Sequence, residues 1–224
     1  MPRSPEMQPF KVTFWLGTPV SLNHPWLHLD GITAHLKYES ALDREYRHLP
    51  SKSVVSQDDH APPLYRKTNG VRHASVSVFV PDLPPYTYTM FKRFEPEGYP
   101  RRGPQNVNIG SGHYRNYMLR MVLKPCERVE FYAFGAMDRI ADLLSTLTHL
   151  GGEGRDGFGQ IIGLDVEPID EDRSLVAGGI AMRPIPVSAL RAWSEAVHVA
   201  WRAPYWARES IALCAPPGAE VVMA

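Results

Sequence analysis

A run of glycines at residues 151–159 is the part of the sequence best suited to close contact with a ligand. Five glycines fall within these nine residues, with an arginine and a phenylalanine among them. Glycine has no side chain to keep a ligand away from the backbone N–H groups, and arginine can add a charged hydrogen bond to phosphate. The run therefore predicts contact with phosphate or ribose through six residues: Gly152, Gly154, Arg155, Gly157, Phe158 and Gly159.

The glycine run contains the letters of a dinucleotide-binding fingerprint, Gly-x-Gly-x-x-Gly. In that fingerprint the glycines follow a strand and open a helix, whereas here residues 137–149 predict a helix before them and residues 160–166 predict a strand after them. A P-loop is excluded because the Lys and Ser/Thr that it requires are absent. Glu153 and Asp156 flank the arginine and weaken phosphate binding, so backbone contacts and a purely structural bend both stay open.

One histidine stands where proton transfer is conceivable. His113 precedes Tyr114 and Arg115 in a basic segment, and histidine and tyrosine can move protons between a ribose 2′-OH and a leaving 5′-oxygen. No second acid–base partner is identifiable, so we interpret these residues as RNA contacts and assign no catalytic residue. The two cysteines and the remaining histidines fit no metal or nucleophile motif, so we expect neither a metal nor a cofactor.

The charges of the chain are unevenly distributed although its formal net charge is zero. Between residues 91 and 128, eight Lys/Arg stand against three Asp/Glu, interleaved with aromatic residues. Aromatic rings stack on bases while basic groups hold phosphates. This pattern predicts RNA contacts at Arg101 and Arg102, with Lys52 reaching the same groove, although a solvated face is the alternative for scattered charges. A local balance of −4 at residues 163–173 leaves another surface for protein neighbours.

The elements that must position these residues predict an α+β fold. Strands are expected at residues 10–16, 73–80, 116–123, 129–134 and 160–166, and helices at 24–36 and 137–149. These elements contain the order strand, helix, strand, strand, helix, strand, which is that of the ferredoxin-like (RRM-like) fold.

Two further segments complete the expected organisation. Residues 86–114 lack a buried face and predict an inserted β-hairpin that projects from a domain of residues 1–168. Residues 169–224 form an extension packed on that domain, with a short helix at 187–197, a strand at 210–214 and a cluster of aromatic side chains that clamps it to the body.

The helix, glycine run and apolar strand resemble the glycine-rich loop of the RAMP superfamily of CRISPR RNA-binding proteins. Residues 24–36, HPWLHLDGITAHL, resemble the first-helix segment of the small "Cas five"-group subunit of type IV CRISPR effector complexes. Residues 49–54, LPSKSV, match the Pro-Ser segment that follows in that branch. Together these matches cover most of residues 10–168.

The resemblance implies a non-catalytic subunit of a type IV CRISPR ribonucleoprotein. It would grip the 5′ handle of the guide RNA (crRNA), contact the backbone and large subunits, and serve surveillance of target DNA, whose sequence is read by base pairing. Two alternatives stay open: a metal-independent endoribonuclease with His113 and Tyr114 as nearest candidates, and a protein-docking subunit with incidental RNA contact. No apolar run approaches the ~18 residues of a membrane span, and no signal peptide is recognisable, so we expect a cytoplasmic location.

Overall fold

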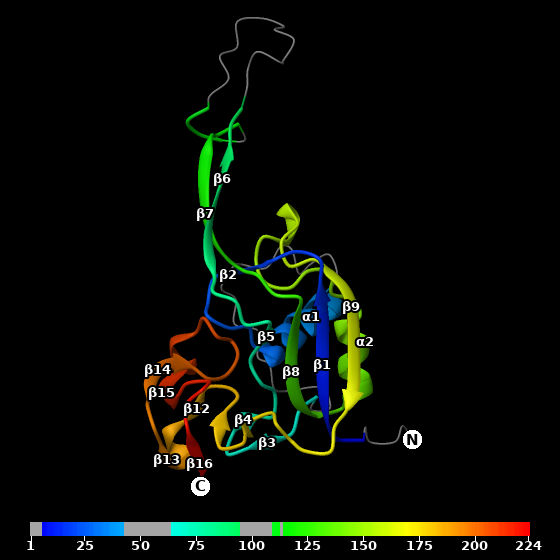
Figure 1. Cartoon of the computed structure of the whole chain (residues 1–224), viewed down its shortest axis with the longest axis vertical. Helices are drawn as coiled ribbons and strands as arrows, with labels where there is room; N and C mark the ends of the chain where they lie inside the picture. Colours follow the sequence, from blue (N-terminus) through cyan, green and yellow to red (C-terminus); the bar gives the residue numbers. More distant parts are fainter. Residues whose placement is uncertain (1–5, 43–63, 95–108, 113) are drawn as a thin grey trace, which may run out of the picture.

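The computed structural model describes residues 6–42, 64–94, 109–112 and 114–224. The body is a four-stranded antiparallel sheet with the strand order β5-β8-β1-β9, and both helices lie on one face of it (Figure 1). The strands are β1 (Gln8–Leu16), β5 (Val78–Val80), β8 (Arg128–Gly135) and β9 (Ile161–Pro168), and the helices are α1 (Leu29–Leu42) and α2 (Met137–Leu144).

Alternation along the two central strands builds the core. Phe10, Val12 and Phe14 of β1 point toward the helices and are fully buried, while the residues between them face the opposite side. β8 alternates in the same way, because successive side chains of a strand point to opposite faces. Leu29 of α1 and Ile140 of α2 close this core from the helical side.

The α+β class and three predicted strands, at residues 10–16, 129–134 and 160–166, are confirmed with small changes in their limits. The expected strand at 73–80 is shorter. Only Val78–Val80 form a regular strand, and Ala74 and Val76 make isolated bridges to other segments. Along the chain the body therefore runs strand, helix, strand, strand, helix, strand.

Both predicted helices are too long at one end. The first begins at Leu29, since His28 pairs with Val76 in an isolated β-bridge and residues 24–28 lead into the helix. The second ends at Leu144 instead of reaching residue 149. Directly after it, the hydroxyls of Ser145 and Thr146 donate to carbonyls three residues earlier, at 2.7 and 2.8 Å, which offers the backbone an alternative to further helix.

A β-ribbon projects from the body. Its strands β6 (Tyr86–Lys92) and β7 (Tyr117–Lys124) pair antiparallel, and the short β2 (Val20–Leu22) joins β7 at the base (Figure 1). The strand predicted at 116–123 exists, but it lies in this ribbon and outside the central sheet. The ribbon therefore extends to Lys124, beyond the predicted limit near residue 114, because the segment after the hairpin tip pairs back along β6 before the chain enters β8.

Residues after β9 form a separate layer of short strands with its own small core. They are β10 (Val176–Ala177), β11 (Ile180–Ala181), β12 (Ile185–Pro186), β13 (Leu190–Trp193), β14 (Val197–Ala200), β15 (Ile211–Ala215) and β16 (Val221–Met223). The predicted strand at 210–214 is confirmed as β15. The predicted helix at 187–197 is wrong: one 3-10 turn, Val187–Ala189, leads into β13, which pairs with β16 and thereby satisfies its backbone in a sheet. The β3 (Lys67–Thr68) and β4 (Val71–Arg72) hairpin lies beside this layer (Figure 1).

A buried ionic junction attaches this layer to the body. Arg183, fully buried, donates to the carbonyls of Arg72 and Ala74 at 2.7 and 2.8 Å and lies 3.6 Å from the Asp30 carboxylate. The Tyr205 hydroxyl donates to Asp30 at 2.5 Å. A Cβ at residue 31 would come within 3.1 Å of the Tyr205 ring. In the Asp-Gly pair of the first-helix segment, Asp30 therefore accepts the hydrogen bond of Tyr205, and Gly31 leaves room for its ring.

Some aromatic side chains of the extension attach it to the body, as predicted, and others are exposed. The Tyr205 ring stacks on His28 at 3.6 Å, and burial lowers the pKa of His28 to about 3, so that the imidazole is neutral. Trp201 packs against the small core and its carbonyl accepts a hydrogen bond from Arg183. Trp193 and Trp206 are instead exposed. None of the helices in the described ranges is long and apolar enough to cross a bilayer.

Candidate nucleic-acid interface

The ribbon has two faces of different chemistry. Its register pairs Tyr88 with Met121 and Phe91 with Met118 without a bulge, so even-numbered residues of β6 lie on one face and odd-numbered residues on the other. The even face carries Tyr86, Tyr88 and, from β7, Tyr117, each exposing 42–46% of its surface. We call this the tyrosine face.

The tyrosine face combines flat rings with positive charge. The Lys92 ammonium lies 5.7 Å from the centre of the Tyr117 ring, directly across the ribbon. Over residues 83–94 and 109–126 the sequence has five Lys/Arg and no Asp/Glu. Among the cations of this part of the chain that the structure describes, only Lys124, at the base, pairs with an acid, Asp82. Exposed aromatic rings beside cations suit single-stranded nucleic acid, which stacks its bases and binds through its phosphates.

The glycine run folds back against the base of the ribbon. The Phe158 ring meets the Tyr88 ring edge to face with centres 5.8 Å apart, so the loop adjoins the tyrosine face. The loop is held from below by residues 18–21. Gly152 N–H donates to the Ser21 carbonyl at 2.9 Å, and Gly159 N–H donates to the Pro19 carbonyl at 2.8 Å. The Thr18 hydroxyl donates to the Gly157 carbonyl at 2.7 Å.

The glycines of the run have different roles. Gly151 and Gly159 adopt φ of +86° and +66°, and a Cβ at either would collide with a backbone carbonyl, so the fold itself requires them. Gly157 also has a positive φ, +87°, but a Cβ there would enter open space. Gly154 and Gly152 have no such backbone constraint, although a Cβ at Gly154 would press on the His149 side chain at 2.9 Å.

Several amides of the loop point away from internal acceptors. In the ranges that the structure describes, no protein acceptor takes the backbone N–H of Glu153, Gly154, Arg155 or Phe158. Arg155 is exposed between the exposed Glu153 and Asp156. The loop can therefore offer backbone donors and one guanidinium beside Tyr88, with the two acids opposing tight phosphate binding.

Comparison with known families identifies the chain. The family model described as "CRISPR type IV associated protein Csf3" matches residues 89–217, more than half of the sequence. The chain belongs to the Csf3 family. A search of curated proteins finds no match. The matched residues run from the ribbon through the glycine loop into the C-terminal layer, and the first-helix segment at 24–36 lies outside them.

The predicted site residues of this Csf3 chain fall into separate places. Tyr114 and Arg115 precede β7, where the centre of the Tyr114 ring lies 4.8 Å from that of Phe94, whereas the glycine loop contacts Tyr88 through Phe158. Lys52, Arg101, Arg102 and His113 lie outside the described residues. The sequence interpretation missed Tyr86 and Tyr88 as site residues, although the alternation Tyr-Thr-Tyr-Thr at 86–89 signals a two-faced strand.

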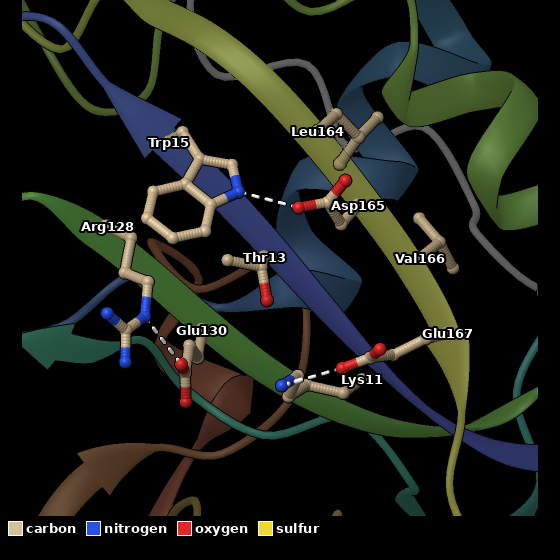
Figure 2. A pocket seen from close by; sticks show the side chains of 9 residues that line it. All are labelled: Lys11, Thr13, Trp15, Arg128, Glu130, Leu164, Asp165, Val166 and Glu167. Carbon is tan, nitrogen blue, oxygen red and sulfur yellow. Dashed lines mark hydrogen bonds and ion pairs between the residues drawn. The ribbon is translucent and has the colours of Figure 1, made fainter.

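The open face of the central sheet is a second candidate surface (Figure 2). A shallow hollow of about 580 Å³ is lined there by outward side chains of β1, β8 and β9: Lys11, Thr13, Trp15, Arg128, Glu130, Asp165 and Glu167. Lys11 pairs with Glu167 at 2.7 Å, Arg128 with Glu130 at 2.8 Å, and the Trp15 indole N–H donates to Asp165 at 2.6 Å. With three carboxylates against two cations, this face repels phosphate, so the ribbon is the better candidate for nucleic acid.

Proposed function

We propose that this chain is a non-catalytic crRNA-binding subunit of a type IV CRISPR ribonucleoprotein effector complex. In this proposal it grips the 5′ handle of the guide RNA, contacts the backbone and large subunits, and supports surveillance of target DNA in the cytoplasm. Membership of the Csf3 family supports a place in such an assembly. The ribbon supports the RNA contact, since its described residues carry cations and exposed tyrosines without any acid.

The proposed RNA path runs over the tyrosine face and the adjoining loop. Bases stack on Tyr86, Tyr88 and Tyr117, while Lys92 and Arg155 contact phosphates and backbone amides of the loop approach the sugar-phosphate chain. Within this proposal residues 1–168 are a RAMP domain of ferredoxin-like type with an inserted hairpin. The strand order β5-β8-β1-β9 supports this assignment, as do the helices that follow β1 and β8 along the chain. Residues 169–224 are its C-terminal extension.

Binding and cleavage of repeat RNA test this proposal together. The purified chain is incubated with a single-stranded RNA of the repeat sequence in the presence of a chelator, and retention and cleavage are followed in the same samples. We expect retention of intact RNA. Metal-independent cleavage that Tyr114→Phe abolishes would overturn the non-catalytic role in favour of an endoribonuclease.

The salt dependence of binding locates the contact. Lys92→Ala should flatten the slope of log K against log salt concentration by roughly 0.7, the value for one phosphate contact on a single strand. The control is Arg191→Ala, which removes another exposed cation, from β13 in the C-terminal layer. Equal slopes in the two variants would remove the ribbon from the interface.

A further inference from the structure

The face of the ribbon opposite the tyrosines carries exposed apolar side chains beside threonines and one arginine. Phe91 and Met118 stand directly across from each other on it and expose 57% and 53% of their surface. Val122, next but one along β7 from Arg120, is also exposed on this face. We call Phe91, Met118 and Val122 the apolar face. Exposed large apolar side chains on a projecting element indicate a surface that a partner covers.

Protein suits this face better than nucleic acid does. Stacking with bases needs flat rings, and the apolar face has one, Phe91, whereas the tyrosine face has three with Lys92 beside them. Methionine and valine contribute area and shape but no ring. Methionine and phenylalanine are enriched in protein–protein interfaces, where they fill apolar pockets of the partner.

The arginines on and beside the apolar face indicate the chemistry of its partner. The Arg93 guanidinium lies 5.7 Å from the centre of the Phe91 ring, and Arg120 lies on the same face between Met118 and Val122. The described ribbon has no acid to balance them. A second copy of this chain would oppose arginine with arginine, which is unfavourable. A complementary partner is apolar at its centre with carboxylates at its rim.

We propose that the apolar face docks a neighbouring protein subunit of the same ribonucleoprotein, through an apolar surface bordered by Asp or Glu. The inference rests on the proposed function for the identity of the assembly, and it divides the ribbon between two partners. Guide RNA lies on the tyrosine face and protein lies on the apolar face. The ribbon, which stands away from the body with both faces exposed at its outer half (Figure 1), is thereby covered on both sides.

Two matched double variants of the full chain test this division. Phe91→Thr with Met118→Thr alters the apolar face, and Tyr88→Thr with Tyr117→Thr alters the tyrosine face. Threonine retains β-propensity, so the ribbon keeps its pairing in both. Each variant is measured alone for affinity to repeat RNA and for thermal melting. Each is then mixed with the other purified subunits and guide RNA, and incorporation is followed by analytical ultracentrifugation.

We expect the apolar-face variant to bind RNA within twofold of the parent while its incorporation into the complex weakens at least about tenfold, a loss typical of truncated interface anchors. Normal incorporation would overturn the proposal. RNA affinity lost as strongly as in the tyrosine-face variant would also overturn it and assign both faces to nucleic acid. A parent dimer that this variant abolishes would assign the face to a second copy. If the tyrosine-face variant binds RNA normally while the apolar-face variant fails to assemble, the proposed RNA contact fails and the protein contact stands.

Discussion

The ribbon and the open face of the central sheet use the same kinds of side chain for opposite purposes. Both combine an aromatic ring with a cation about 5.5 Å away: Tyr117 with Lys92 on the ribbon, and Trp15 with Arg128 on the sheet. On the sheet each cation also contacts a carboxylate at hydrogen-bonding distance. On the ribbon, the one ion pair among the described residues joins Lys124 to Asp82 at the base. The comparison teaches that two surfaces with the same kinds of side chain differ in how many of their described cations are paired with carboxylates, and the proposed RNA contact depends on that difference.

The electrostatics of the sheet explain why its charges are unavailable. The hydrogen bond from Lys11 to Glu167 raises the pKa of the lysine. Burial alone would raise the pKa of Glu130, but hydrogen bonds from Arg128 and Tyr132 outweigh it and leave the pKa below its usual value. Each partner thus holds the other in its charged form, and a phosphate would have to break a pair before it could bind.

The largest effect is expected from the rings of the ribbon. Tyr88→Ala combined with Tyr117→Ala should reduce the affinity for repeat RNA by at least about 30-fold, because base stacking on each aromatic residue contributes about 1–3 kcal/mol. Trp15→Ala on the sheet is the matched control and should leave RNA affinity unchanged. Equal losses in an equilibrium binding assay would remove the distinction between the two surfaces.

A smaller effect should follow from making the sheet resemble the ribbon. Glu130→Gln with Glu167→Gln frees Arg128 and Lys11 and changes the local balance by two charges. We expect RNA binding to strengthen by about two- to fivefold at low salt, and the gain to vanish near 0.5 M salt because it is electrostatic. No gain at low salt would mean that the shape of the sheet, and not its carboxylates, excludes RNA.

The glycine loop is intermediate between the two surfaces, because its one arginine stands between two acids while several of its described backbone N–H groups stay open to a ligand. Gly157→Asn keeps the left-handed backbone, which asparagine tolerates, and places a side chain in open space. If RNA approaches the loop backbone, affinity should fall about threefold with melting nearly unchanged. Gly157→Val is the comparison, since it adds backbone strain of about 1 kcal/mol or more that melting detects. Unchanged RNA affinity in Gly157→Asn would leave the loop a purely structural bend.

The smallest expected effect is on stability. Lys11→Met breaks the Lys11–Glu167 pair, whose side chains are 26% and 56% exposed, and should cost less than about 1 kcal/mol in urea unfolding. Because the folded-state pKa of Lys11 is raised, its contribution is complete at neutral pH and disappears as the pH rises past 10.5 through the higher folded-state value. The parent and the variant should therefore converge in stability only in strong base. A difference that persists there would come from packing.

Local patterns in the sequence determined much of this molecule. The periods of apolar residues predicted the α+β class, three strands of the central sheet and the helix before the glycine run, because side-chain alternation depends only on neighbours along the chain. Composition likewise placed the basic, aromatic segment. The family resemblance drawn from residues 10–168 is confirmed as to the type IV CRISPR family by a match at residues 89–217.

Tertiary structure alone decided what those elements do together. It paired residues 117–124 with β6 instead of adding them to the central sheet, and this pairing put the exposed tyrosines on one face and Phe91 and Met118 on the other. It placed the Phe158 ring against Tyr88, and it placed Tyr205 against Asp30 and Gly31. Each outcome joins residues far apart in the chain, through strand register, ring packing or buried charge. Such contacts form only when distant parts of the chain fold together, and the local spacing of apolar residues does not predict them.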